Sequence, residues 1–370
     1  MKELKLLLSF KKSAKLNGGY ILSLAISVIL ALLVGAAIMA VCGHDPIAAY
    51  ASVIEGALGS NRAIGDTLAK SATLCLLGLA MAVAAQAGIF NVGGEGQLFL
   101  GAMASAVIGA YLTGWPAFVA VPIAIIAAIA AGAIYAWIPA WLKVKLNVNE
   151  VVTTIMMNSA AIYFCKFLSS GPFKTAERGI SSGTTKLDAG FAFSKVIPLS
   201  NLTVSIFISA FVALAVWYLM KKTTIGYEMD MSGKNRRFAE YMGIKSGKLM
   251  IISMLISGGI CGLTGMFEVY GIHKRFIEAV SREFYYDGML VAMIVRYNPV
   301  GIILMSLFFG ILKIGATGME KMGIPSEIML IIQSIVIFFM AAENGITKMI
   351  KDRLVRVRAR REAIERSARV

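Results

Sequence analysis

Long apolar runs separated by short polar segments dominate the pattern along this chain. A run of about 20 apolar residues forms a helix long enough to cross a hydrocarbon core of about 30 Å. We therefore expect an all-α integral membrane protein, with residues 1–370 forming a single transmembrane domain. The pattern predicts ten membrane helices, at residues 20–41, 68–87, 97–112, 117–141, 151–168, 202–220, 249–269, 284–295, 300–314 and 328–340.

A polar segment interrupts this pattern between the second and third runs. Residues 88–97 read Gly-Ile-Phe-Asn-Val-Gly-Gly-Glu-Gly-Gln, which places Asn91, Glu95 and Gln97 among four glycines. Non-helical backbone and polar side chains at membrane depth are tolerated only when they are buried in protein or line a cavity. We therefore expect a broken helix near 88–97 and a path for something polar.

A second irregular segment lies in the C-terminal half. The run at 284–295 is only about 12 residues long, so its helix would extend roughly 18 Å and could not span a bilayer alone. Without this crossing the basic tail would lie outside, so we expect a short or broken helix that still crosses. Paired interruptions of this kind are typical of a midplane binding site in repeat-built transporters. The two halves, however, show no repeat at the residue level.

The basic residues follow the distribution of a membrane protein. The chain is 58% hydrophobic and 15% charged, with mean hydropathy +0.76 and net charge +15. Its Lys and Arg residues lie in short connections and in the tail, which argues against nucleic-acid binding. With both termini in the cytoplasm, 24 of the 36 basic residues fall on the inner side. Residues 221–248 then form the longest cytoplasmic loop. Residues 347–370 form a basic cytoplasmic tail that would rest on anionic lipid or bind a partner.

The long inner loop contains a short amphipathic pattern. Residues 232–241 predict one helix that ends at Gly243. Phe238, Ala239 and Met242 would form its apolar face, beside basic side chains. Such a helix could be held by a cytosolic partner or could rest on lipid headgroups, and its position leaves both open.

The sequence contains no motif for catalysis. Residues 243–249, Gly-Ile-Lys-Ser-Gly-Lys-Leu, have the wrong spacing for a Walker A loop and lack Ser or Thr after the final lysine. The four cysteines and two histidines are widely spaced and form no metal or redox motif. We therefore expect no enzyme activity, and any ATP hydrolysis would occur on another chain.

Three stretches resemble one protein family, the permease subunits of bacterial ABC importers. Residues 88–102 are similar to the sequence motif that follows the family's second helix, with Leu-Phe-Leu-Gly-Ala continuing the polar segment. Residues 147–158, Asn-Val-Asn-Glu-Val-Val-Thr-Thr-Ile-Met-Met-Asn, are similar to the phrase that opens its fifth helix. Residues 226–244 resemble its cytoplasmic coupling loop. The resemblance covers the whole chain and is closest to nucleoside permeases, in the group that also imports branched-chain amino acids, ribose and simple sugars.

The resemblance implies a type II-like importer fold of about ten helices in the bacterial cytoplasmic membrane. It also implies a second permease subunit, an ATPase with two nucleotide-binding halves that carries ATP and Mg, and an extracytoplasmic substrate-binding protein or lipoprotein. The chain itself would hold no cofactor. Nucleosides are the expected substrates, and ribose-like simple sugars are the alternative. The residues expected to couple to the ATPase are Gly233, Lys234, Asn235, Arg236, Arg237, Ala239 and Gly243.

Polar residues inside the apolar runs are candidates for the substrate pathway. Amide and carboxylate groups can bond ribose hydroxyls or base edges, or they can tie down backbone groups that a broken helix leaves free. Asn91 and Glu95 would share one face if their segment were helical. Asn149 and Glu150 are expected to begin the fifth helix as cap and first turn. The candidates are Asn91, Glu95, Gln97, Asn158 and Asp287.

Two other transport mechanisms are compatible with the membrane pattern. A gradient-driven carrier would use an intramembrane ion or proton relay, formed by Glu95, Glu268, Asp287 and Lys313. A channel would conduct without ATP or a gradient-coupled cycle. The coupling loop and the sequence motifs shared with the family favour an ABC importer permease over a gradient-driven carrier and over a channel.

Overall fold

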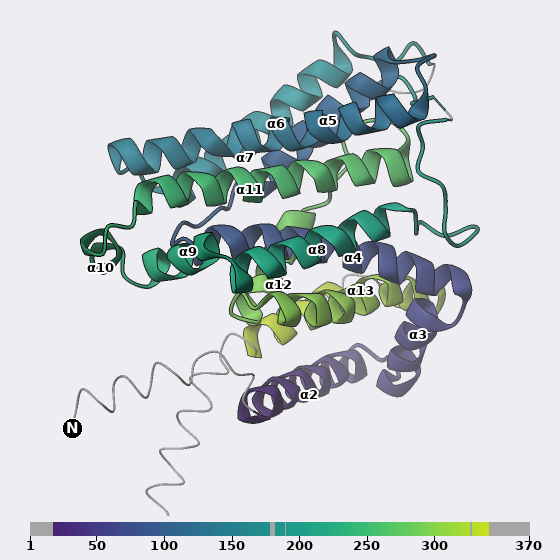
Figure 1. Ribbon diagram of the computed structural model, residues 1–370. Coiled ribbons are helices and arrows are strands. Elements are labelled where there is room, and N and C mark those ends of the chain that lie inside the picture. Colours follow the sequence, from purple (N-terminus) through teal and green to yellow (C-terminus); the bar gives the residue numbers. More distant parts are fainter. Residues whose placement is uncertain (1–17, 178–181, 189, 326–327, 340–370) are drawn as a thin grey trace, which may run out of the picture. The chain divides into compact units, whose positions relative to one another are not determined.

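The computed structural model describes residues 18–177, 182–188, 190–325 and 328–339 (Figure 1). Regular structure in these ranges is helical, apart from three isolated β-bridges. The expected basic tail at 347–370 lies outside the described residues. The elements are α2 (Gly18–Val41), α3 (Pro46–Leu58), α4 (Asn61–Gln86), α5 (Gly94–Tyr111), α6 (Ala117–Leu146), α7 (Glu150–Ser170), α8 (Ser205–Lys222), α9 (Thr224–Lys234), α10 (Arg236–Tyr241), α11 (Ser246–Phe267), the π-helix η1 (Glu268–His273), α12 (Phe284–Ile294) and α13 (Pro299–Lys321), followed by the helix Ile328–Phe339.

Each predicted run coincides with a helix, but the region before the second run differs. The helix α4 begins at Asn61 instead of residue 68, because the Ser60 hydroxyl caps it by accepting from the N–H of Ala63 at 3.1 Å. The apolar pattern also does not predict α3, whose 13 residues are too few for a span. A bend of 118° separates α3 from the end of α2.

Fewer helices than predicted are long and apolar enough to cross a membrane. Six described helices meet this condition: α4, α6, α7, α8, α11 continued by η1, and α13. The bent pair α2 and α3 would make a seventh if it formed one span. The chain is therefore an all-helical membrane protein, but the described residues do not contain ten evident spans. The polar start of α5 and the 11-residue length of α12 explain why these two do not qualify.

The chain divides into two compact units. One contains the described parts of residues 1–51 and 320–370, and there the Tyr50 hydroxyl holds α3 to α2 by donating to the Leu32 carbonyl at 2.6 Å. The other unit is Ser52–Met319. It contains all of the pathway and coupling candidates, so the candidate site can be described within this unit.

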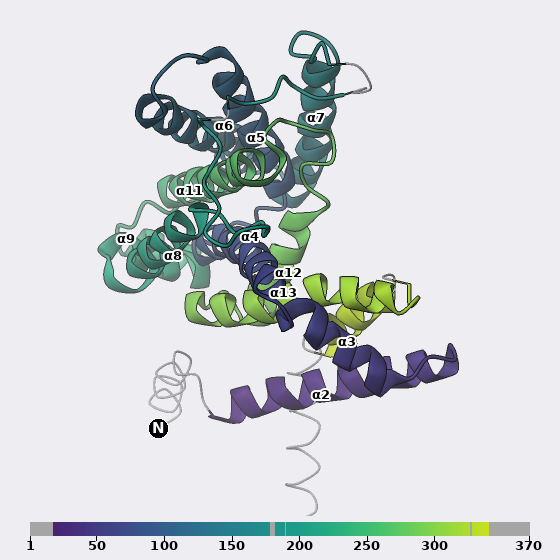
Figure 2. The same cartoon turned by 90° about the vertical axis from the view of Figure 1, so that its right-hand side faces the viewer.

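The helix α11 is central to the Ser52–Met319 unit. It packs against α4, α5 and α6, as Figure 2 shows. Glycines allow the close contact with α6, because a Cβ on Gly132, Gly258 or Gly262 would collide with facing backbone. The helix α12 packs against α4 and also contacts α5. This arrangement brings the first turns of α5 and α12 together beside α11.

The segment predicted as one helix at 232–241 forms parts of two helices. The break occurs at Asn235, whose backbone is extended and whose side chain caps α10 by accepting from the N–H of Phe238 at 3.0 Å. The predicted end is correct, since α10 stops at Tyr241 and Gly243 has a left-handed backbone with φ +82°. Of the expected apolar face, Ala239 is buried, whereas Phe238 and Met242 are exposed and available to a partner or to lipid, so the role of this face stays a prediction.

Candidate functional site

The helices α5 and α12 begin in the buried interior of the Ser52–Met319 unit, and their first turns meet. Residues 87–93 are non-helical and lead into α5 at Gly94. Residues 274–283 are also irregular and lead into α12 at Phe284. The interruptions that the sequence predicts in separate halves of the chain therefore lie together in one polar site.

Glu95 connects the two helix starts. It lies in the first turn of α5, is 3% exposed, and accepts from the N–H of Tyr285 at 3.0 Å. The N–H of Glu283 and the hydroxyl of Ser281 also donate to its carboxylate. The Ser281 oxygen accepts from the N–H of Phe284 at 3.2 Å. These bonds satisfy free donors at the start of α12, where the helix dipole also favours a negative charge.

Asn91 and Gln97 form a reciprocal amide pair. The Asn91 Nδ2 group donates to Gln97 Oε1 at 2.9 Å, and Gln97 Nε2 donates to Asn91 Oδ1 at 3.1 Å. Asn91 also donates to the Ser257 hydroxyl of α11 at 2.9 Å and accepts from the N–H of Gly93 at 3.0 Å. Because Asn91 precedes α5, it does not share a helix face with Glu95.

Asn158 of α7 links the irregular segment to both helix starts. Its Nδ2 group donates to the Val92 carbonyl at 2.8 Å and to the Tyr286 hydroxyl at 3.0 Å. Its Oδ1 atom accepts from the N–H of Gly96 at 2.8 Å. One amide side chain thus bonds residues before α5, in the first turn of α5 and in the first turn of α12.

Tyr285 is a central member of this network that the sequence analysis did not single out. Its side chain is fully buried, and its hydroxyl donates to the Asn91 carbonyl. Its ring lies against Gly94, where a Cβ would collide with it. The available signal was its position in the short eighth run, two residues before Asp287. A tyrosine there is equally compatible with ordinary packing.

The other charged candidates have different partners. Asp287 pairs with Lys313 of α13, and Glu268 accepts from the Thr73 hydroxyl at 2.9 Å. The Lys70 ammonium lies 2.8 Å from the centroid of the Phe284 ring and interacts electrostatically with Glu268. The carboxylates of the suggested relay are therefore engaged in three sets of contacts: Glu95 with the start of α12, Asp287 with Lys313, and Glu268 with Thr73.

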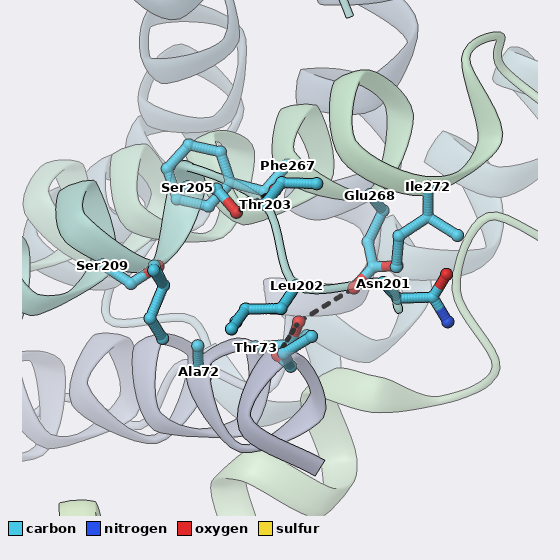
Figure 3. Close-up of a pocket in the computed structure, with 12 residues that line it drawn as sticks. Ala72, Thr73, Asn201, Leu202, Thr203, Ser205, Ser209, Phe267, Glu268 and Ile272 are labelled. Carbon is cyan, nitrogen blue, oxygen red and sulfur yellow. Dashed lines mark hydrogen bonds between the residues drawn. The ribbon is translucent and has the colours of Figure 1, made fainter. Parts of the chain in front are cut away.

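A small cavity with both polar and apolar lining lies between α4, α8 and the α11–η1 junction (Figure 3). Hydroxyl, amide and carboxylate side chains line it, among them Thr73, Asn201, Thr203, Ser205 and Glu268. Its volume of about 20 Å³ is enough for one water molecule. Sequence reasoning did not identify this cavity, because its lining comes from three distant segments and contains ordinary serines and threonines.

Four of the five pathway candidates are brought together in the polar site. Asn91, Glu95, Gln97 and Asn158 are each at most 3% exposed, and each makes hydrogen bonds within the site. The arrangement can hold two helix starts in place. It could also exchange its internal hydrogen bonds for bonds to a polar solute if the helices separate. The role of these four residues in a substrate pathway therefore stays a prediction.

The coupling candidates other than the buried Ala239 lie on an exposed surface that carries several charges, beside the end of α4. Lys234 pairs with Asp230 at 2.5 Å and Arg236 with Glu240 at 2.9 Å, each across one helical turn. Arg237 is exposed, and Tyr241, which the sequence analysis did not list, is 91% exposed. Gly233 faces the turn at residues 86–88. Figure 1 shows α9 and α10 at the same end of the unit as the end of α4.

The chain is similar to known transport proteins over most of its length. Residues 63–341 match the family described as the permease component of branched-chain amino acid transport systems. The chain is 34% identical to the guanosine ABC transporter permease protein NupP of Bacillus subtilis, over 87% of this chain and 93% of that protein. It is 32% identical to the nucleoside ABC transporter permease protein NupB of Lactococcus lactis, over 88% and 92%. It is 30% identical to the glucose ABC transporter permease protein TsgB13 of Haloferax volcanii, over 85% of each. No solved structure matches the chain significantly.

Proposed function

Because this chain belongs to the family of permease components of branched-chain amino acid transport systems, we propose that it carries nucleosides across the membrane. It is a permease subunit of an ABC transporter. The observation that carries the substrate proposal is the similarity to a nucleoside permease and a guanosine permease along nearly their whole lengths. The amide and carboxylate groups of the polar site are suited to bond ribose hydroxyls and base edges.

A simple sugar is the second candidate substrate. It is favoured by the relative named as a glucose permease, at 30% identity. Nucleosides and sugars share a hydroxyl-bearing ring, so the same hydrogen-bonding groups would suit both. The base distinguishes them, and a nucleoside-specific site would reject a free sugar because its base-facing polar groups would be left unpaired.

The proposed assembly has four kinds of component. This permease would pair with a second permease, an ATPase with two nucleotide-binding halves that binds ATP and Mg, and an extracytoplasmic substrate-binding protein or lipoprotein. The chain would cross the bacterial cytoplasmic membrane ten times with both termini inside, which places α9 and α10 in the cytoplasm. The concentration of Lys and Arg at 221–248 supports this orientation.

The proposed pathway passes the first turns of α5 and α12. These helix starts are joined by their own side chains Glu95 and Tyr285 and by Asn158 of α7. ATP-driven movement of the permease would break these contacts and expose their polar groups to the substrate. Weak and exchangeable bonds suit a permease, since a tightly held substrate would not be released.

The test is to capture the tagged chain from its native membrane, identify its partners by mass spectrometry, and measure uptake by the captured complex in liposomes. We expect a double-domain ATPase, a second permease and ATP-dependent uptake of labelled guanosine that excess ribose or glucose does not inhibit. ATP-dependent uptake of labelled glucose or ribose, with no uptake of guanosine, would replace the nucleoside proposal by the sugar proposal. Uptake that follows a proton or sodium gradient without ATPase would overturn both.

A further inference from the structure

Two glycines, one in α9 and one in the chain that leads into the polar site, bring these two segments into close contact. A Cβ on Gly88 would lie 2.9 Å from the Cα atom of Gly233, and a Cβ on Gly233 would lie 3.0 Å from the Gly88 nitrogen and closer still to the Gln86 carbonyl oxygen. Gly88 also has φ +78°, a conformation that favours glycine. Any side chain at Gly233 would therefore push α9 away from residues 86–88.

Further contacts fasten α9 to the same turn. The Gln86 Nε2 group donates to the carbonyl of Gly226 at 2.8 Å and to that of Met220 at 3.3 Å. Met229, in the middle of α9, is fully buried in a cluster with Ala87 and Leu249. The turn is thus bonded near the start of α9, packed at its middle and in close contact near its end. We call these contacts of residues 86–88 with α8 and α9 the α9 joint.

The α9 joint leads directly into the polar site. Ile89, the next residue, is 1% exposed and packs with Ala84, Ala140 and Met254. Asn91 follows two residues later and bonds Gln97, Ser257 and Tyr285. No long flexible connection separates the joint from these bonds. A displacement of α9 would therefore be transmitted to the backbone at residues 88–91.

The C-terminal end of α9 also leads to the exposed surface. Only Asn235 separates α9 from α10, and its side chain caps α10. Gly233 is among the residues that the sequence predicts to meet the ATPase, yet its missing Cβ points at Gln86 and Gly88. Gly233 thus faces the turn at residues 86–88, whereas α10, which follows it, lies on the exposed surface.

We propose that Gly88, Gly233 and Gln86 are positioning residues that transmit the movement of α9 and α10 to the polar site. This inference rests on the proposed function, since the movement would come from the partner ATPase. Substitution at the joint should reduce the amount of substrate moved per ATP hydrolysed, whereas substitution on the outer face of α10 should weaken binding of the ATPase.

The experiment compares Gly233→Ala and Gln86→Ala with a control, Gly259→Ala, in the complete transporter in liposomes. Gly259 is a buried α11 glycine whose added Cβ would meet Cγ2 of Ile129 at 3.1 Å, a milder contact than that of a Cβ on Gly233 with the Gln86 carbonyl oxygen. Guanosine uptake and ATP hydrolysis are measured together, and co-purification of the ATPase is measured separately. We expect Gly233→Ala to lower uptake per ATP roughly tenfold, and Gln86→Ala to lower it by a smaller factor, with the ATPase still bound.

The outcomes separate this proposal from the proposed function. If both Gly233→Ala and Gln86→Ala show the same uptake per ATP as Gly259→Ala, the proposal that the α9 joint transmits movement is wrong. If the transporter with Gly233→Ala does not assemble, Gln86→Ala alone tests the proposal, because it removes two hydrogen bonds without adding an atom. An unchanged ratio in that variant also overturns the proposal. Failure of the unaltered chain to bind an ATPase or take up guanosine would instead overturn the proposed function.

Discussion

Two groups of helix starts in this protein obtain their side-chain caps in different ways. At exposed ends, the residue before the helix supplies the cap: Ser60 for α4, Asn149 for α7 and Asn235 for α10. The helices α5 and α12, which begin at the polar site, have no such bond from Gly93 or Glu283. Their caps come from residues far away in the chain, Asn158 for α5 and Glu95 for α12.

This difference follows from the surroundings of each helix start. At an exposed end, water can satisfy backbone donors, so a local cap adds a modest stabilisation. Away from water, an unpaired donor costs several kcal/mol, so a partner must be present whatever its position in the sequence. A cap taken from a neighbouring helix also disappears when the two helices separate. The caps of α5 and α12 are therefore suited to a site that changes with conformation.

The largest effect is expected for Glu95→Ala. This change leaves donors of Tyr285, Glu283 and Ser281 without the carboxylate they share, and should lower the free energy of unfolding by about 3 kcal/mol. Thermal unfolding in detergent measures the loss. Glu95→Gln retains one acceptor oxygen and should be intermediate. Equal stability of Glu95→Ala and the unaltered chain would show that α12 does not depend on this cap.

Asn158→Ala should have the next largest effect. It removes the bond to the Gly96 N–H and the bonds to the Val92 carbonyl and the Tyr286 hydroxyl, so we expect a loss of about 2 kcal/mol. Hydrogen exchange should also become faster in the first turn of α5. Exchange that accelerates across the whole chain to the same degree would indicate general destabilisation and contradict a specific cap.

Tyr285→Phe removes a single buried hydroxyl and keeps the ring that packs on Gly94. We expect a loss of about 1 to 1.5 kcal/mol, because the Asn91 carbonyl loses its donor. The measurement is the same thermal unfolding experiment. If the polar site opens during transport, the variant should also show a larger basal leak of guanosine than Gly259→Ala. A leak no greater than that of this control would argue against a role of the bond in closing the site.

The smallest effect is expected for Asn149→Ala, the matched substitution at an exposed cap. Its side chain accepts from the N–H groups of Val151 and Val152 at 2.9 and 3.3 Å, and water can replace it. The loss should be about 1 kcal/mol or less, with uptake nearly unchanged. A loss greater than that of Asn158→Ala would reverse the comparison between exposed and internal helix starts.

The sequence by itself determined the helical membrane class, the place of each apolar run, both interruptions and the glycine that ends α10. It also marked Asn91, Glu95, Gln97 and Asn158 as unusual, because polar groups in apolar runs stand out in any linear pattern. These features depend on hydrophobic period, turn chemistry and the cost of burying polar groups. All of these act over a few neighbouring residues.

The tertiary structure alone decided how these features are joined. Asn158 lies 62 residues from Gly96, whose N–H it caps, and Glu95 lies 190 residues from Tyr285, so no local pattern contains these caps. For the same reason Tyr285 does not stand out in the sequence, because its importance comes from its contacts with Gly94 and Asn91. It could not show that Gly233 faces Gly88, since a glycine's role depends on what approaches it. Partner choice in the polar site is a property of helix packing, and helix packing is settled only when distant segments meet.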